Sequence, residues 1–525
     1  MVRMNVVGLT PIIPILFAFA LPLTSILVKG DRRIVQAYAL TGTGLTLLSA
    51  VKLFQLAYSS NEPLIYTFGG WTAPVGIIYE VDRMSALIAL VTAALMFLIA
   101  IYSYRYLEGE GGLEWYYTLY LGLEAGLLGV LLTGDAFNLF VMIEVTSIAA
   151  YALVMYYRDR GDSVVAGLKY ALIGAVGTTM YFIALGVLYY GFGTLNFANL
   201  SALIHGMSFP VVGEPYRDVV IASGVALALA TWAFLIKAAV FPNHFWLPEA
   251  HPAAPSPISA ILSGLVVNVG VYALARFLYT VYGGALTSTL SSVIHALSIV
   301  LMLLGAVSAL FGALMMLVQR DVKRLIAYST VMHMGYLVMA VGVGTQLALS
   351  AAIFHMVNHA IAKALLFLSA GVFIHAAGSR NLEDLAGLGR KMPVATFSLA
   401  VASLSLVGVP PFNVFFSKLL LFNAFLDENP VLALVLVVSS VTALVAYVRV
   451  FYEVWLGKPG KEVELRESWS MSGVCLVLAL ACVVVGLVAP YVVSHYVEPA
   501  AVQAVDYRVY IQKALEYAAK TKLGL

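Results

Sequence analysis

Residues 235–257 read Leu-Ile-Lys-Ala-Ala-Val-Phe-Pro-Asn-His-Phe-Trp-Leu-Pro-Glu-Ala-His-Pro-Ala-Ala-Pro-Ser-Pro. Lys237 ends a long apolar run, and Pro242 and Pro248 follow it. Each proline removes a backbone donor and clashes with the preceding helical turn, so an intact helix is not expected here. A lysine inside an apolar segment costs roughly 2.5–3.5 kcal/mol on membrane-insertion scales. Lys237, beside a helix break, is therefore a candidate functional residue.

The composition of the chain predicts an integral membrane protein. Of its 525 residues, 62% are hydrophobic and 11% are charged, far from the averages of soluble domains. We predict an all-α polytopic protein of the cell (inner) membrane. Cys475 and Cys482 lie in one apolar run, which favours packing residues over a disulfide framework or a metal site. No cofactor is expected, because no soluble part is long enough to hold a large one, and no nucleic-acid partner is indicated.

One crossing needs about 20 apolar residues, which predicts about fourteen transmembrane helices. The expected spans are 10–28, 34–57, 82–104, 114–133, 135–157, 164–190, 219–250, 256–280, 289–317, 322–342, 346–374, 394–426, 430–455 and 470–495. We interpret the first as a membrane helix and not as a signal peptide. Lys and Arg gather in the odd-numbered loops, although the loop after span 7 has none and Arg217 is an exception. This bias predicts that both termini face the outside.

The order of spans divides the chain into four parts. Residues 1–110 hold spans 1–3 and an outside hairpin or loop at 58–80, with Gly69-Gly70 as its turn signal. Residues 111–285 hold spans 4–8, and residues 286–456 hold spans 9–13. Residues 457–525 hold the last span and the segment 498–522. The pattern of that segment fits a short amphipathic helix or a frayed tail.

Spans 7 and 12 share two unusual features. Each is too long for one crossing and contains proline midway, at Pro242 and at Pro410-Pro411. Each also has a lysine beside the break, Lys237 in the first and Lys418 in the second. A unit of five spans must reappear in the opposite orientation when it is repeated, so spans 4–8 and 9–13 are predicted to be inverted repeats. Such paired breaks indicate an ion pathway near mid-membrane.

Two acids lie inside predicted spans. Glu144 is nine residues past Asp135, about 13–14 Å along a helix, and is therefore expected near mid-membrane. A carboxylate at this depth belongs to a proton path, pairs with a buried cation, or is a protonated structural acid. Glu124, on the preceding span, has the same alternatives.

His355, His359 and Lys363 are spaced by four residues, so they form one helix face, the histidine stripe. Metal binding by the two histidines lacks an evident third ligand, and Lys363 would repel a cation. A proton relay fits better, because a neutral imidazole accepts a proton on one nitrogen and releases one from the other. His333 is either a relay member or a satisfied core residue.

Lys237 suits the same chemistry. Burial favours the neutral form of a lysine, whereas a nearby carboxylate favours the charged form. A Lys237 that gains and loses Glu144 as a partner is therefore a switch able to move a proton. A fixed Glu144–Lys237 pair that joins two helices is the structural alternative.

Three further residues accompany the breaks. Lys169 occupies a place in the helix before the first break that matches Lys363 before the second. His244 and His251 flank the first break. They either line a water-filled passage or cap backbone groups freed by the prolines.

Four stretches together resemble the antiporter-like proton-channel subunits of respiratory complex I, Mrp-type cation/proton antiporters and membrane-bound hydrogenases. They are Thr-Gly-Asp-Ala-Phe-Asn-Leu-Phe-Val-Met-Ile-Glu (133–144), Lys-Ala-Ala-Val-Phe-Pro-Asn-His-Phe-Trp-Leu-Pro-Glu-Ala-His (237–251), Arg-Asp-Val-Lys-Arg-Leu-Ile-Ala-Tyr-Ser-Thr (320–330) and His-Met-Val-Asn-His-Ala-Ile-Ala-Lys-Ala-Leu-Leu-Phe (355–367). The first stretch and the Pro-Pro ahead of Lys418 look most like the D-type subunit of Mrp antiporters and its hydrogenase relative.

The resemblance implies a hydrated polar axis between two half-channels. Glu144 and Lys237 would be the charge-switching pair of one half, the histidine stripe the central connection, and Lys418 the terminal site of the other. Proton movement would be coupled to redox chemistry or Na+ movement in partner membrane subunits, such as a hydrogenase or redox arm. The chain itself would hold no catalytic centre.

One departure from the family pattern concerns span 8. In Ser-Ala-Ile-Leu-Ser-Gly-Leu-Val-Val-Xaa-Val-Gly-Val-Tyr the family usually has lysine at Xaa, and this chain has Asn268. An amide does not titrate, so the link from Lys237 to the histidine stripe runs through water or that half-channel is impaired. The alternatives to a pumping subunit are a self-sufficient secondary transporter, a complex I subunit and a scaffold.

Overall fold

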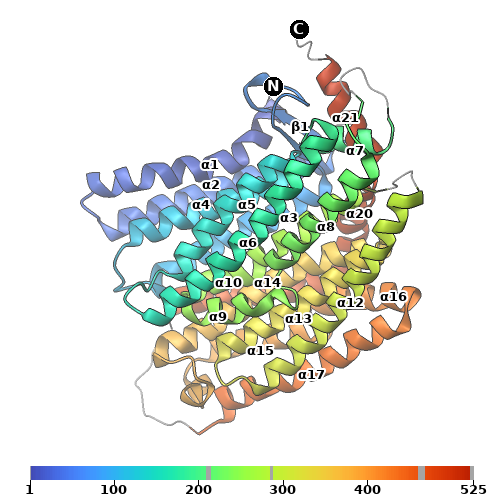
Figure 1. Cartoon of the computed structure of the whole chain (residues 1–525). Coiled ribbons are helices and arrows are strands. Elements are labelled where there is room, and N and C mark those ends of the chain that lie inside the picture. The colour runs from blue at the N-terminus through green and yellow to red at the C-terminus, as the bar shows by residue number, and fades with distance from the viewer. Residues whose placement is uncertain (1, 208–213, 284–287, 459–467, 521–525) are drawn as a thin grey trace.

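The apolar runs form a bundle of long helices in the computed structural model, which describes residues 2–207, 214–283, 288–458 and 468–520 (Figure 1). The long helices are α1 (Val2–Leu27), α2 (Arg32–Tyr58), α3 (Arg83–Tyr106), α4 (Leu113–Leu132), α5 (Ala136–Val154), α6 (Gly161–Phe192), α8 (Val219–Lys237), α12 (Ser288–Val318), α13 (Val322–Val343), α14 (Gln346–Ala377), α17 (Pro430–Leu456) and α18 (Trp469–Leu487). One more span, 256–281, consists of α10 (Ser256–Ile261), η3 (Leu262–Val266), α11 (Val267–Ala275) and η4 (Arg276–Val281).

The described residues contain 13 helices that are long and apolar enough to cross a membrane. The remaining predicted span, 394–426, is made of α15 (Pro393–Val407) and α16 (Asn413–Glu428), each too short to be counted alone. With this broken segment included, the order of spans agrees with the sequence prediction of about fourteen. The described residues therefore form an all-helical polytopic membrane protein apart from one small hairpin.

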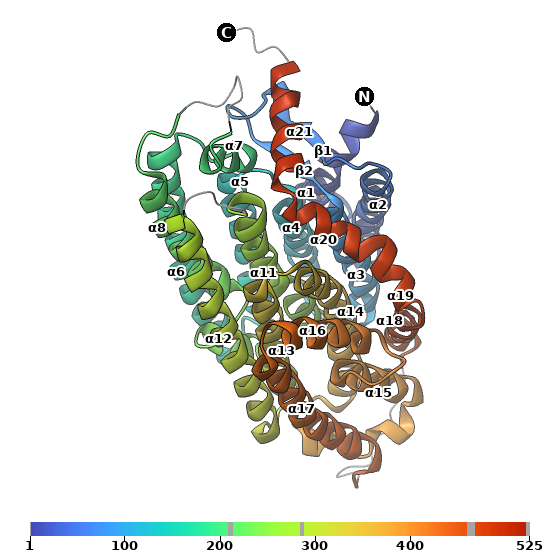
Figure 2. The same ribbon diagram turned by 90° about the vertical axis from the view of Figure 1, so that its right-hand side faces the viewer.

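That hairpin pairs β1 (Leu64–Thr67) with β2 (Ile78–Val81), antiparallel, with Leu64 opposite Val81. The predicted turn is η1 (Phe68–Gly70), where Gly69 and Gly70 have φ of 64° and 81°, a conformation that favours glycine. The hairpin lies at the end of the bundle where α1 begins and α21 (Tyr507–Lys520) ends (Figure 2). We call this end the terminal face.

Several short elements connect the long helices. They are α7 (Phe197–Ile204), η2 (Asn243–Trp246), α9 (Leu247–Ala253), η5 (Leu382–Leu385), η6 (Leu388–Lys391), α19 (Ala489–Val492), η7 (Val493–Val497) and α20 (Glu498–Val505). The sequence did not predict α7. The tail segment 498–522 forms the helices α20 and α21 within its described part, so the amphipathic helix was the better of the two predictions for residues up to 520.

Both predicted breaks are present. Helix α8 ends at Lys237, and the chain resumes helical structure only at η2 and α9. In the second break, α15 is capped by Gly408, whose φ is 93°. A Cβ on Gly408 would come within 3.0 Å of the Lys418 Cδ atom, so the glycine also makes room for the lysine stem.

Two matching caps support the inverted repeat. Asp135 caps α5 and bridges to Asn196, and Asp321 caps α13 and bridges to Asn381. The backbone of residue 134 hydrogen-bonds to residue 78 of the hairpin, so α5 begins at the terminal face. Asp321 is instead joined through Arg380 to the start of α6, at the opposite end of the bundle. The two caps therefore face in opposite directions, as inverted repeats require.

Candidate functional site

Lys237 is held at the first break by hydroxyl groups. It is the last residue of α8 and is only 7% exposed. Its Nζ donates to Ser147 Oγ at 2.7 Å and to Tyr151 OH at 3.2 Å, both on α5. The break thus presents an ammonium group to the neighbouring helix.

Glu144 lies one turn before Ser147 on α5, but it forms no ion pair with Lys237. The two charges still act on each other electrostatically. Glu144 is partly buried, and its Oε1 has no hydrogen-bond partner in the described part of the chain. The predicted pair is therefore open in this structure, in contrast to the fixed bridge of the structural alternative.

The two lysines at matching places, Lys169 and Lys363, have different surroundings. Lys169 is exposed and forms an ion pair with Glu249 at 3.3 Å. Glu249 also pairs with Arg324 at 3.3 Å. Lys363 is fully buried. The two lysines therefore match in their place along the chain but differ in burial, because α6 turns the Lys169 side chain outward.

The histidine stripe is buried, as are most residues of α13 and α14. Figure 2 shows these two helices among the other helices of the bundle. His333 on α13 joins it, with its Nδ1 3.0 Å from His355 Nε2. The Nδ1 of His355 is 3.0 Å from Ser417 Oγ, the residue before Lys418. The His359 ring centroid is 5.1 Å from that of His333, and neither His359 nitrogen has a partner among the described residues.

Hydroxyl groups surround the lysines at the two ends of this series. Lys363 Nζ donates to Ser329 Oγ and to the Ile326 carbonyl oxygen, the latter at 3.2 Å. Ser329 is in turn hydrogen-bonded to Tyr447 OH. Lys363 and its hydroxyl partners thus form one buried polar cluster.

Lys418 Nζ donates to Ser440 Oγ at 2.8 Å and to the Val407 carbonyl oxygen at 3.0 Å. Tyr336 OH lies 3.3 Å from the same serine oxygen. Beside Lys418 there is an apolar groove, lined by Gly408, Ser440 and residues of α16 and α17. Lys418 therefore borders a groove between α16 and α17.

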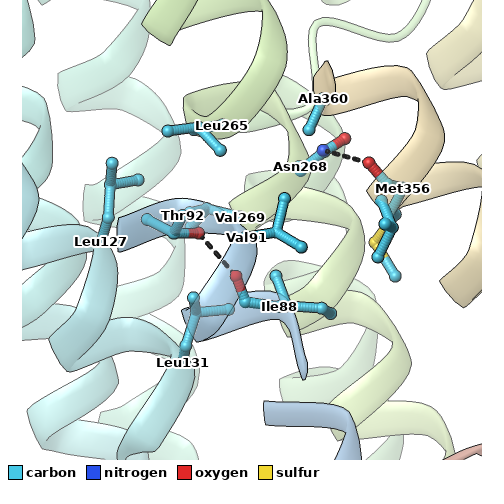
Figure 3. A pocket seen from close by; sticks show the side chains of 11 residues that line it. Ile88, Val91, Thr92, Leu127, Leu131, Leu265, Asn268, Val269, Met356 and Ala360 are labelled. Atoms are coloured by element: carbon cyan, nitrogen blue, oxygen red, sulfur yellow. Dashed lines mark hydrogen bonds between the residues drawn. The ribbon is translucent and has the colours of Figure 1, made fainter. Parts of the chain in front are cut away.

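Asn268 and Glu124 are buried without full hydrogen bonding. Asn268 Nδ2 donates to the carbonyl oxygens of Gly264 at 2.8 Å and Met356 at 3.3 Å, whereas its Oδ1 has no partner within the described ranges. Figure 3 shows Asn268 at a small cavity of about 20 Å³ between α3, α4, α11 and α14, with Thr92 on another wall. Glu124 is fully buried on α4, and neither carboxyl oxygen has a described partner.

The two histidines of the first break are both buried among aromatic rings. His244 lies 5.6 Å from Phe241 between ring centroids, and His251 lies 4.6 Å from Phe367. Both nitrogens of His251 lack a hydrogen-bond partner in the described structure. The charges of Lys323 and Lys363 both act on His251. His251 is therefore not a cap for freed backbone groups.

Sequence reasoning missed a buried ion pair near the terminal face. Arg276 donates to both carboxyl oxygens of Asp82, at 2.6 and 2.5 Å, and both side chains are buried. The signal was present, since Arg276 is a charged residue inside the predicted span 256–280. The hydroxyl partners of the lysines were also missed, because serine and tyrosine are common in membrane helices. Among the described residues, no cluster of three or more His, Cys, Asp or Glu could hold a metal ion.

Comparisons in sequence find relatives along most of the chain. A family model described as NADH:quinone oxidoreductase/Mrp antiporter, TM, matches residues 133–443. The chain is 34% identical to NADH-quinone oxidoreductase subunit N of Desulforudis audaxviator, over 93% of this chain and 96% of that protein. It is 29% identical to the D subunit of the Na(+)/H(+) antiporter of Alkalihalophilus pseudofirmus, over 92% of this chain and 94% of that protein.

Solved structures are similar over nearly the whole chain. A chain of the membrane-bound sulfane sulfur reductase, an archaeal respiratory membrane complex, has a TM-score of 0.88 and 32% identity, covering 97% of this chain and 99% of that one. A chain of the Mrp complex from Dietzia sp. DQ12-45-1b has a TM-score of 0.86 and 25% identity, covering 98% and 100%. A chain of respiratory complex I from Thermus thermophilus, with a TM-score of 0.71 and 23% identity over 92% and 98%, shares the fold.

Proposed function

This chain belongs to the NADH:quinone oxidoreductase/Mrp antiporter transmembrane family, and on that premise we propose that it is the proton-translocating subunit of a multisubunit energy-converting membrane complex. One observation carries the proposal. Buried titratable side chains continue from Lys363 through His359, His333 and His355 to Ser417, next to Lys418. Such residues inside a membrane protein mark ion or proton pathways.

In the first repeat, the open Glu144–Lys237 pair is the switch. A lysine favours its charged form beside a carboxylate and its neutral form when it is buried without one. When Glu144 approaches, Lys237 holds its proton; when the pair opens, Lys237 is left with only Ser147 and Tyr151 and releases it. The Ser147 and Tyr151 hydroxyl groups orient the Lys237 amine both when the pair with Glu144 is closed and when it is open.

In the second repeat, the histidines carry the proton between two lysines. His355 contacts His333 on one nitrogen and Ser417 on the other, so a proton taken at one nitrogen leaves from the opposite one. Lys363 and Lys418 stand at the two ends of this series. Two lysine charges in one polar axis repel each other, so loading one end favours release at the other.

The relatives are named for quinone reduction, Na(+)/H(+) antiport and sulfane sulfur reduction, and two of the solved structures are complexes of the Mrp and sulfane sulfur reductase types. We infer that this chain likewise works among other membrane subunits, which supply redox chemistry or Na+ movement. A hydrogenase arm, the other alternative from the sequence, has no counterpart in these names. The complex lies in the cell membrane with the terminal face outside.

The test is proton transport by the purified complex in liposomes, compared for the wild type and for Lys237→Ala, Glu144→Ala and Lys458→Ala. Lys458 is exposed at the end of α17 and serves as a matched control. We expect both changes in the switch to abolish proton transport, with a loss of about 100-fold or more, and the control to transport at the wild-type rate. Subunit composition is checked by gel filtration for each variant.

Two outcomes contradict the proposal. Ion exchange by the isolated chain at the rate of the complex would favour a self-sufficient transporter. Unchanged proton transport in assembled Lys237→Ala complexes would favour a scaffold whose buried charges only join helices.

A further inference from the structure

A second polar stripe lies on the helix that contains Asn268. Asn268, Tyr272, Arg276 and Thr280 are spaced by four residues along α11 and η4, which puts them on one face. Asn268 stands at the cavity of Figure 3, and Thr280 Oγ1 donates to the Ala504 carbonyl oxygen of α20 at the terminal face. The stripe thus leads from the cavity inside the bundle to that face.

Hydrogen bonds join its middle members. Tyr272 OH donates to the Leu131 carbonyl oxygen at 2.7 Å and accepts from Arg276 Nε at 3.0 Å. Arg276 is held in turn by both oxygens of Asp82, whose side chain also contacts Ser85. A guanidinium does not give up its proton, so Arg276 is a fixed charge and not a relay.

Beside this pair lies a buried acid. Glu80 on β2 is 1% exposed, its carboxyl oxygens form no hydrogen bond of ordinary geometry within the described structure, and the Tyr510 hydroxyl is the donor that faces them. The charged and titratable groups that face it are Arg276, Asp82 and Tyr510. Burial raises the pKa of Glu80 well above its ordinary value, while Arg276 opposes that shift. Burial therefore favours the protonated form of the Glu80 carboxyl group, and the neighbouring Arg276 charge favours loss of that proton.

The C-terminal helix covers this acid. A Cβ on Gly134 would come within 3.0 Å of Glu80 Cβ and 3.3 Å of Tyr510 OH, so the tyrosine and the acid border the same small space. Tyr510 is buried, and its ring centroid is 5.8 Å from the Arg276 guanidinium carbon. Further along α21, Lys513 pairs with Glu62 ahead of the hairpin. Contacts of Tyr510 and Lys513 thus hold helix α21 over the end of the polar stripe at the terminal face.

We propose that Glu80 is the proton-release group of the first repeat on the terminal face, supplied along the Asn268–Tyr272 stripe and covered by α21 through Tyr510. The inference rests on the proposed function and adds the route by which protons leave. The Tyr272 hydroxyl takes a proton from water in the cavity and gives up its own toward Tyr510, on which both Tyr272 and Glu80 act, and the proton passes from there to Glu80. The Glu80 carboxyl then gives it to water on the terminal face. Arg276 and Asp82 are positioning residues, because they hold Tyr272 and set the charge beside Glu80.

The experiment measures proton transport by the whole complex in liposomes while the pH on the terminal side is varied. Glu80→Gln keeps the shape of the side chain and removes its titration. We expect its transport to fall about tenfold or more and to lose the dependence on terminal-side pH that the wild type has. Glu214→Gln, which removes an exposed acid from a loop outside the stripe, is the matched control and keeps the wild-type profile.

Tyr510→Phe is the second variant and keeps the ring that covers Glu80. We expect it to shift the terminal-side pH profile, and it decides the question if Glu80→Gln does not assemble. Wild-type rate and pH profile in an assembled Glu80→Gln complex, or in Tyr510→Phe where only that variant assembles, would overturn the inference. A wild-type complex that moves no protons would overturn the proposed function instead, so the two failures are distinguishable.

Discussion

The two repeats use the same break and different chemistry beside it. In the first, Lys237 faces Ser147 and Tyr151, with Glu144 nearby on the same helix as these two hydroxyl residues. In the second, Lys418 faces Ser440 and a backbone carbonyl oxygen. No carboxylate forms an ion pair with Lys418 or Lys363 within the described ranges. Lys237 forms no ion pair either, but Glu144 acts on its charge, whereas no carboxylate of the described residues acts in this way on Lys363 or Lys418. The nearby acid is therefore what distinguishes the first repeat.

The matched caps show where this difference comes from. Ser147 is twelve residues after the cap Asp135, and His333 is twelve residues after the cap Asp321. Nine residues after the same caps stand Glu144 and Thr330. At equivalent depth, the first repeat has an acid and a hydroxyl where the second has a hydroxyl and an imidazole. The first repeat thus has groups suited to holding one proton on the Glu144–Lys237 pair. The second repeat has imidazole groups suited to transferring protons.

The largest expected effect on proton transport is the difference between alanine variants of Lys363 and Lys169, the two lysines at matching places in the repeats. Lys363→Ala removes a fully buried member of the proposed pathway, so we expect proton transport to fall about 100-fold or more. Lys169→Ala removes an exposed ion pair with Glu249, which is worth at most about 1 kcal/mol. Transport in liposomes should then stay within about twofold of wild type. Equal losses in the two variants would show that the repeats are alike in function at this place.

The sequence predicts the features of the fold and the site that depend on local residues, and it does not predict those that depend on how helices pack. Proline and glycine act locally, so both breaks and the hairpin turn were predicted correctly. The buried series was predicted by spacing alone for His355, His359 and Lys363. The contact of His333 with His355 depends on how α13 packs against α14, and the outward direction of Lys169 depends on how α6 sits at the edge of the bundle. Rotation of one helix against another has no local signal.

A smaller effect on proton transport is expected when His333 of the second repeat is replaced by serine, the residue at the equivalent position of the first repeat. His333→Ser places at this position the residue type that Ser147 supplies in the first repeat. The 3.0 Å contact with His355 is lost, but His359 and Ser417 remain, so we expect proton transport to fall about tenfold. His333→Gln, which keeps hydrogen bonding without titration, is the control. Full activity of the serine variant would mean that the relay does not need His333.

The buried acid Glu80 should make the stability of the wild type depend on pH. Burial raises the pKa of Glu80 above its ordinary value of 4.5, so below that pH the carboxyl is protonated in both the folded and the unfolded chain. As pH rises, the unfolded chain releases this proton first, and the wild type loses stability relative to Glu80→Gln until the raised pKa is passed. Asp321→Asn, which removes an ion pair with Arg380 at 2.6 Å, should instead lower stability at neutral pH. Thermal unfolding of the purified complexes between pH 4 and pH 8 measures both effects, and the same pH dependence in the wild type and in Glu80→Gln would contradict the assignment of Glu80 as a buried acid with a raised pKa.

The smallest effect concerns Asn268, where a titratable group can be added to the first repeat. We expect Asn268→Lys to assemble normally, because a cavity lies beside it and Thr92 and Met356 on its walls offer a hydroxyl and a carbonyl oxygen to an ammonium group. Burial of a lysine at such a depth costs roughly 2.5–3.5 kcal/mol without partners, and these oxygens offset part of it. Asn268→Leu, which fills the same space without a polar group, is the matched control and should slow proton transport. Failure of the lysine variant to assemble would show that this cavity is structural packing, and that the first repeat differs from the second in its core as well as in its acid.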